Sequence, residues 1–227
     1  ISFNSFFKTE EGFWVYSCFS DENKEHYNLT LLTSDMQSVR KQFFPQKEFV
    51  NVTFSPTFMN DENRRLFFYY PSSNIIYEIS GTDVIPYLQA DFGDKTMPYD
   101  KIIEMENKEE YDKLLSGKAY LGDINRCFAN QDRIFFSFME SGLGIVHSYN
   151  CFYNIKSKEG HVFNNPFMLS VKYPVSTQLL YSTDTMLVYP VYPSIFTDDS
   201  LAELSKSLST DIQFDSNVIL AICSLKE

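Results

Sequence analysis

The chain has 227 residues, of which 44% are hydrophobic and 17% aromatic, enough for a substantial core. Its formal net charge is −11 and no run of Lys or Arg occurs, so neither a nucleic-acid partner nor an anionic membrane surface is expected. The sequence also contains no apolar run near the 18 residues that a transmembrane helix needs, and it does not begin as a signal peptide does.

Short runs rich in aromatic and β-branched residues predict antiparallel strands joined by polar turns along most of the chain. The first set covers residues 13–19, 27–33 and 39–44. The second set begins at residue 57 and continues with residues 75–79 and 84–92. The third set covers residues 124–129, 134–139 and 145–153. We expect the sets to be four-stranded sheets with boundaries near residues 45, 93 and 165.

Two segments depart from the strand pattern. Residues 104–116 lack Pro and Gly, carry acidic residues early and place apolar residues near helical spacing. Residues 198–208 begin with Asp198 as a candidate N-cap and carry three leucines at i, i+3 and i+7. We expect two short helices inserted into an otherwise β-rich chain.

Two similar turns indicate the repeat length. "SDENK" at residues 20–24 and "NDENR" at 60–64 stand 40 residues apart, which matches a propeller blade of about 40–45 residues. Both lack the ligand spacing of an EF-hand and are interpreted as solvated hairpin tips. The fold class predicted is therefore all-β, a β-propeller with about four blades in this chain and two short helical insertions.

The cysteines and histidines give no recognisable metal or redox site. The four cysteines are far apart in apolar settings, which predicts buried free thiols but leaves disulfides open; they are Cys18, Cys127, Cys151 and Cys223. The three histidines, His26, His147 and His161, lack zinc-binding spacing. The sequence therefore nominates no catalytic, cofactor-binding or metal-binding residues, and no cofactor.

The triplet Asp91-Phe92-Gly93 matches the D-F-G of protein kinases. The sequence has no glycine-rich loop, no V-A-I-K strand and no H-R-D motif to accompany it. We therefore predict a structural role: Phe92 largely buried between blades, Gly93 permitting a turn, and Asp91 bonded to loop backbone without metal or nucleotide.

The stretches "FFYYPSSNIIYEIS" and "VIPYLQADFGDKTMP" resemble the signature of an uncharacterised six-bladed β-propeller family from Gram-negative anaerobes. The closing "DSNVILAICSLKE" resembles that family's C-terminal segment, with Val218 in place of its usual proline. The family's members are NHL-like in shape and generally exported, many as lipoproteins. The resemblance implies that residues 1–227 form a single propeller domain lacking its N-terminal blades, with a periplasmic or outer-membrane-anchored location.

The sequence leaves two functions open. The first is a non-catalytic exported propeller that binds a glycan, a peptide or a protein through its channel or loop face. The alternative is a hydrolase or lyase whose site is built from loops at the channel mouth. Convergence of two or more carboxylates, or of a His and a carboxylate, at the channel mouth would favour the alternative. Aromatic pairs such as 67–68 and 135–136 are expected in the core between blades, since neighbours along a strand face opposite sides.

The last apolar run, "VILAICSL" at residues 218–225, predicts a strand that is packed on both faces. We expect this strand to complete a blade with N-terminal residues that precede this chain. Without them, the open blade edge is expected either to pair with a second copy or to leave an open, crescent-like array of blades; self-association in solution is the expected sign.

Overall fold

The computed structural model describes residues 4–17, 27–45, 58–60, 64–69, 73–129, 132–164, 167–170, 173–175, 181–182 and 186–224. It forms two compact units, Ile1–Val162 and Phe163–Glu227. That one domain spans residues 1–227 stays a prediction. The turn at residues 20–24, most of the turn at 60–64, and Cys18 lie outside the described residues. Among those described, no helix is long and apolar enough to cross a membrane.

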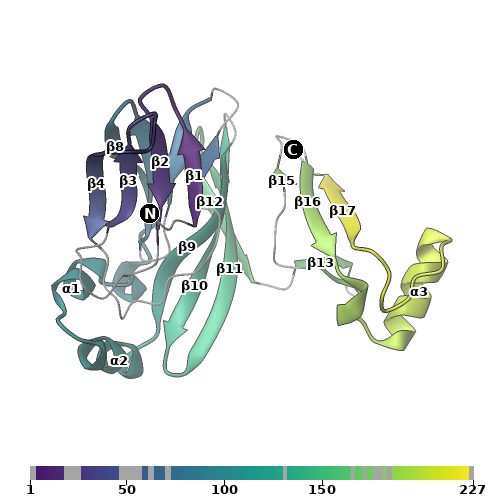
Figure 1. Cartoon of the computed structure of the whole chain (residues 1–227). Helices are drawn as coiled ribbons and strands as arrows, with labels where there is room; N and C mark the ends of the chain where they lie inside the picture. The colour runs from purple at the N-terminus through teal and green to yellow at the C-terminus, as the bar shows by residue number, and fades with distance from the viewer. Residues whose placement is uncertain are drawn as a thin grey trace. The chain divides into compact units, whose positions relative to one another are not determined.

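Three four-stranded antiparallel sheets make up the first unit (Figure 1). The first is β1 (Ser5–Lys8), β2 (Phe13–Tyr16), β3 (Tyr27–Leu32) and β4 (Val39–Pro45), and the second is β5 (Phe58–Asn60), β6 (Leu66–Phe68), β7 (Ile75–Ser80) and β8 (Asp83–Gln89). The third is β9 (Tyr120–Ala129), β10 (Arg133–Gly142), β11 (Ile145–Asn154) and β12 (Glu159–Asn164). Each sheet is a meander in chain order, so the predicted boundaries near residues 45, 93 and 165 are confirmed.

The three sheets meet along their first strands. Strand β5 lies against β1 on one side and against β9 on the other, so these three are neighbouring inner strands. The last strands β4 and β8 are mostly exposed, and β8 accommodates Pro86, as an edge strand can. This arrangement is that of consecutive propeller blades, and we call the sheets blades 1, 2 and 3.

Two aromatic-rich cores hold the blades together. The first interblade core joins blades 1 and 2 and contains Trp14, Tyr16 and Phe68. The second joins blades 2 and 3 and contains Phe67 and Phe136. Neighbours Phe67 and Phe68 on β6 thus face opposite cores, and both are fully buried, as expected from strand alternation.

Phe43 and Phe44 break this alternation. Both pack against the first interblade core, although they are consecutive in β4. The reason is that Phe44 has a left-handed backbone with φ +60°, which turns its side chain to the same side as that of Phe43. Its ring then lies 5.9 Å from that of Phe68 in a stacked arrangement. A local conformation that the sequence pattern does not reveal has therefore placed an additional ring in the core.

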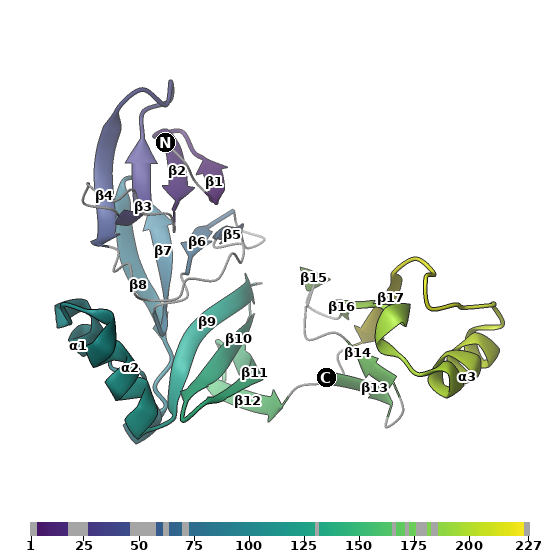
Figure 2. The ribbon, with the colours of Figure 1, turned by 60° about the horizontal axis from the view of Figure 1, so that its bottom comes forward.

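The helical insertion between blades 2 and 3 differs from its prediction. A 3₁₀ turn η1 (Gly93–Lys95) is followed by α1 (Tyr99–Glu104) and α2 (Lys108–Gly117). The helix predicted over residues 104–116 is thus present as α2 but begins at Lys108, and α1 was not predicted. Met105 is extended after α1, and the Asn107 side chain then caps α2 by accepting a hydrogen bond from the Glu110 amide. Figure 2 shows both helices beside β9 and β10.

In the second unit, β13 (Phe167–Ser170) pairs with β14 (Tyr173–Val175), while β15 (Tyr181–Ser182), β16 (Met186–Val191) and β17 (Ile219–Ser224) form a second sheet. A 3₁₀ turn η2 (Pro193–Ile195) and helix α3 (Asp198–Leu208) connect β16 to β17. The predicted bounds of α3 are confirmed. Its N-cap is Thr197 rather than Asp198, because the Thr197 hydroxyl oxygen accepts a hydrogen bond from the Ser200 amide.

Strand β17 has an exposed apolar face. It lies at the edge of its sheet, and Leu220 and Ile222 are 57% and 62% exposed. The expectation that both faces of this strand are packed is therefore not met within the part of the chain that the structure describes. The reason is that no described neighbour covers that side of the sheet.

The buried thiols are confirmed where they are described. Cys127 of β9 and Cys151 of β11 are both free, and each pairs in register with Phe136 of the strand between them. Two strand spacings of about 4.8 Å separate their backbones, too far for a disulfide. Burial raises the pKa of both thiols, so they act as small apolar groups of the second interblade core.

Candidate functional site

Asp91-Phe92-Gly93 ends blade 2 in the way predicted for a structural turn. The Asp91 Oδ1 accepts hydrogen bonds from the Gly93 amide at 2.9 Å and from the Thr96 hydroxyl at 3.3 Å. Gly93 has φ +60°, which glycine adopts without strain. Phe92 is only partly buried against the second interblade core, less than predicted, because it lies at the end of the blade; its ring is 4.6 Å from that of Phe138 in blade 3.

A carboxyl group on the inner strand of blade 3 contacts the helical insertion. Relative to β10, strand β9 carries an extra residue between Gly122 and Asn125, and Asp123 in this bulge has a left-handed φ of 52°. Its Oδ1 accepts a hydrogen bond from the Tyr99 hydroxyl at 3.0 Å, and its amide donates to the same hydroxyl oxygen at 2.6 Å. The bulge thus directs Asp123 to the start of α1.

Glycine at position 122 makes this contact possible. A Cβ there would overlap the Tyr99 hydroxyl and approach the Met97 Cβ to 2.9 Å. The charge of Asp123 also affects the pKa of Tyr111 in α2. We call the unit formed by these residues the Asp123 clasp; its members are Gly122, Asp123, Tyr99 and Tyr111.

The clasp contains strongly perturbed groups. Part of the Asp123 side chain remains accessible, yet dense packing by protein atoms raises its pKa to about 7, against a smaller lowering by the Tyr99 hydrogen bond. Burial, followed by the negative charges of Asp123 and Asp112, raises the pKa of Tyr111 to about 12. Asp123 is therefore a carboxyl group that can gain or lose a proton near neutral pH.

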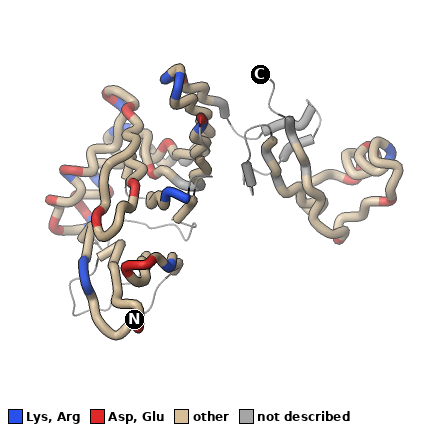
Figure 3. The backbone as a smooth tube through the Cα atoms, turned by 90° about the horizontal axis from the view of Figure 1, so that it is seen from above, with Lys and Arg blue, Asp and Glu red and all other residues tan. Residues whose placement is uncertain are grey.

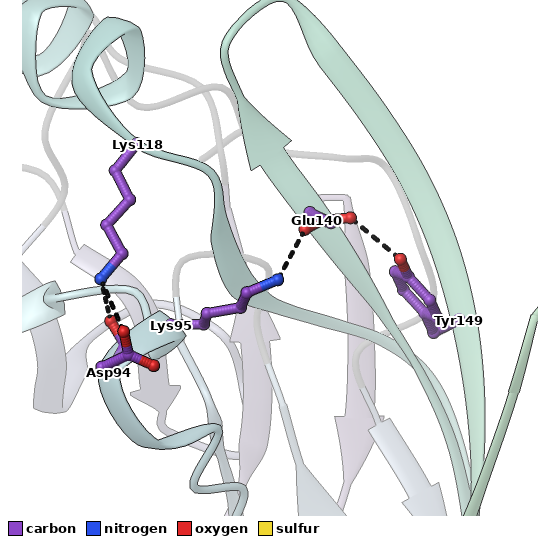
Figure 4. Close-up of polar contacts among 5 residues, drawn as sticks. All are labelled: Asp94, Lys95, Lys118, Glu140 and Tyr149. Atoms are coloured by element: carbon purple, nitrogen blue, oxygen red, sulfur yellow. Dashed lines mark hydrogen bonds and ion pairs between the residues drawn. The ribbon is translucent and has the colours of Figure 1, made fainter.

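A second polar cluster lies where the end of the β10–β11 hairpin meets the connection from blade 2 (Figure 4). Glu140 is 14% exposed; its Oε2 accepts a hydrogen bond from the Tyr149 hydroxyl at 2.9 Å, and its Oε1 lies 3.5 Å from the Lys95 Nζ. Lys118 forms an ion pair with Asp94 at 3.3 Å beside them. We call these five residues the Glu140 cluster.

The Glu140 cluster continues an aromatic stack. The Phe92 ring contacts Phe138, and the Phe138 ring stacks on Tyr149 with centroids 5.4 Å apart and planes 14° apart. The hydrogen bond to Glu140 is the main cause of a raised pKa for the Tyr149 hydroxyl. The cluster thus combines a partly exposed aromatic ring with a carboxylate and an amine, groups suited to a polar ligand that also has an apolar face.

His147 faces the same cluster. In the register of the hairpin, Glu140 pairs directly with His147, and such side chains share one face of the sheet with Cβ atoms about 5 Å apart. His147 is exposed. A His and a carboxylate therefore come together, although the structure shows no hydrogen bond between them. Among the described residues, no group of three or more His, Cys, Asp or Glu is placed to hold a metal ion.

Sequence reasoning nominated none of these residues. Glu140 and His147 flank the predicted turn "SGLG", and a strict two-residue hairpin would have paired them. Asp123 gave no such signal, since its environment depends on a bulge and on Tyr99, 24 residues away.

Comparison with known proteins supports the architecture. A family model described as "6-bladed beta-propeller" matches residues 1–189, and no curated protein matches the chain. A crystal structure of a putative exported protein from Bacteroides fragilis is similar at 15% sequence identity with a TM-score of 0.66. The alignment covers 99% of this chain and 66% of that one, so the chain spans slightly less than two thirds of its length. The chain belongs to the 6-bladed beta-propeller family.

Proposed function

We propose that this chain is part of an exported propeller that binds a glycan, a peptide or a partner protein without transforming it. The observation that carries the proposal is the Glu140 cluster, in which blade 3 and the η1 turn of the helical insertion bring a carboxylate, an amine and a phenol together. The carboxylate is already compensated by Lys95 and Tyr149, which suits hydrogen bonding to a ligand better than proton transfer. Binding by such partly buried polar groups is expected to be oriented and selective.

Export is supported by the name of the Bacteroides fragilis protein and by the family resemblance. A periplasmic or outer-membrane-anchored location, and membership of the lipoprotein-type, NHL-like group, are parts of the same proposal. Acidic residues are spread over both units among fewer basic ones (Figure 3), which argues against nucleic acid as the ligand.

Glycan and peptide arrays probed with the wild-type protein test this proposal. Glu140→Gln should weaken binding of any ligand found by about tenfold or more, since a hydrogen bond to a charged group contributes roughly 1.5–3 kcal/mol. Glu159→Gln, which changes an exposed carboxylate of the same blade, is the matched control and should bind normally. Equal binding by the wild type and Glu140→Gln would place the ligand elsewhere.

The pairing of Glu140 with His147 favours a second candidate, a hydrolase or lyase with these two residues as acid and base. In that case, His147→Ala should abolish product formation while leaving ligand binding within a fewfold of the wild type. If His147→Ala and the wild type both leave the bound ligand unchanged, this candidate is wrong.

A further inference from the structure

The tip of the β10–β11 hairpin has a backbone conformation that leucine adopts only with strain. Three consecutive residues have positive φ there, Gly142 at +126°, Leu143 at +53° and Gly144 at +72°. The two central positions of such a two-residue turn favour glycine or asparagine, because a larger side chain is crowded in the left-handed region. Leu143 is 56% exposed, so burial of its side chain does not offset the strain.

Among the described residues, the tip is fixed to the helical insertion by backbone contacts. The Leu143 amide donates a hydrogen bond to the Leu115 carbonyl of α2 at 2.8 Å. Gly142 is packed so closely that a Cβ there would overlap the Lys118 carbonyl oxygen. Glycine or asparagine at position 143 would keep the hydrogen bond with less backbone strain. The fold therefore holds the tip rigidly without needing a leucine side chain.

The same hairpin carries the polar groups of the Glu140 cluster. Leu143 follows Glu140 by three residues, which is at most about 10 Å along a strand. The Lys95 side chain is 52% exposed and lies 3.5 Å from Glu140, so its ammonium group retains donors for a further acceptor. An exposed apolar side chain on a rigid tip thus lies within a short reach of hydrogen-bonding groups.

We propose that Leu143 is the apolar contact of the Glu140 cluster and that the ligand is a polypeptide rather than a glycan. The inference rests on the proposed binding function and selects among its ligands. The polypeptide places an apolar side chain on Leu143 and a carbonyl or carboxylate oxygen on Lys95. Two or three extended residues span that separation, at about 3.3 Å each.

The chemistry of leucine favours this choice of ligand. An aliphatic side chain offers a sugar neither an aromatic face nor a hydrogen bond, and contact with it would desolvate the sugar hydroxyl groups. An apolar side chain of a peptide instead gains by leaving water with Leu143. Because the tip is already held in place, binding does not have to order it.

A random dodecapeptide library displayed on phage and selected on the wild-type protein, with a glycan array probed in parallel, tests the inference. Leu143→Asn should weaken binding of the selected peptides by about tenfold or more, since it removes the apolar contact, and Glu140→Gln should weaken it as well. The melting temperature of Leu143→Asn should be unchanged or raised, because asparagine tolerates the left-handed backbone. Lys158→Asn is the matched control: Lys158 is exposed with φ +58° between β11 and β12, so this variant relieves similar strain and should bind as the wild type does.

Three results would overturn the inference: equal peptide binding by Leu143→Asn and the wild type, a lower melting temperature for Leu143→Asn, or no selected peptides, with or without glycan ligands. Failure of the proposed function gives a different result. In that case, ligands from either library would bind Glu140→Gln as tightly as the wild type. A ligand that Glu140→Gln binds weakly and Leu143→Asn binds normally would retain the proposed function and exclude the role of Leu143.

Discussion

Asp123 is the residue whose environment departs most from that of an ordinary surface carboxylate. Its pKa of about 7 in the folded protein lies above the value near 3.8 expected in the unfolded chain. Between these values the folded state binds more protons, so the free energy of unfolding falls as pH rises from about 4 to 7 and then levels off.

Replacement of Asp123 by asparagine should remove that loss of stability. Asp123→Asn should be more stable than the wild type at pH 8, by at most roughly 4 kcal/mol at 1.36 kcal/mol per pKa unit, and within about 1 kcal/mol of it at pH 4. Urea unfolding at both pH values measures this. A variant less stable than the wild type at pH 8 would show that ionised Asp123 makes a net favourable contact.

Phe92 tests the structural role of the D-F-G triplet. Phe92→Ala should lower the free energy of unfolding by about 3 kcal/mol, the low end for a Phe truncation, because the ring is only partly buried against the second interblade core. Phe6→Ala is the control: because Phe6 is exposed, its replacement should lower the free energy of unfolding only slightly. Equal changes in the free energy of unfolding for the two variants would show that Phe92 does not stabilise the contact between blades.

At the scale of elements, strand positions were predictable because runs of aromatic and β-branched residues are separated by polar turns, which is typical of strands packed between other sheets. The bounds of α3 were also predictable, since its leucines follow a helical period. The break between α1 and α2 was not, because it depends on the Asn107 cap and on packing of the insertion against β9. Phe44 and Asp123 were missed for a related reason: both have left-handed backbones that side-chain patterning does not encode.

Two glycines test how the insertion is seated. Gly122→Ala should lower the melting temperature, because its Cβ would overlap Tyr99 and displace α1. Gly117→Ala, at the end of α2, has open space around its Cβ and should be neutral or slightly stabilising. Similar melting temperatures for the two variants, measured by circular dichroism, would contradict the close approach of α1 to β9.

At the scale of the whole chain, we propose that the exposed apolar face of β17 causes the chain to self-associate. An edge strand with an uncovered apolar face can pair with a second copy. Light scattering on the 227-residue chain should show a rise in mass with concentration, which Leu220→Glu and Ile222→Glu should abolish. Leu208→Glu, on the exposed side of α3, is the control and should still associate. A monomer at all concentrations would rule out this edge as an interface.

The central claim is that this propeller chain binds its ligand without transforming it. Mass spectrometry of an array-selected ligand, incubated with a stoichiometric amount of the wild-type protein, tests that claim most directly. The ligand should be recovered with its mass unchanged, while Glu140→Gln retains less of it on the protein. Recovery of cleaved or eliminated products, lost in His147→Ala, would contradict the claim and establish catalysis at the same cluster.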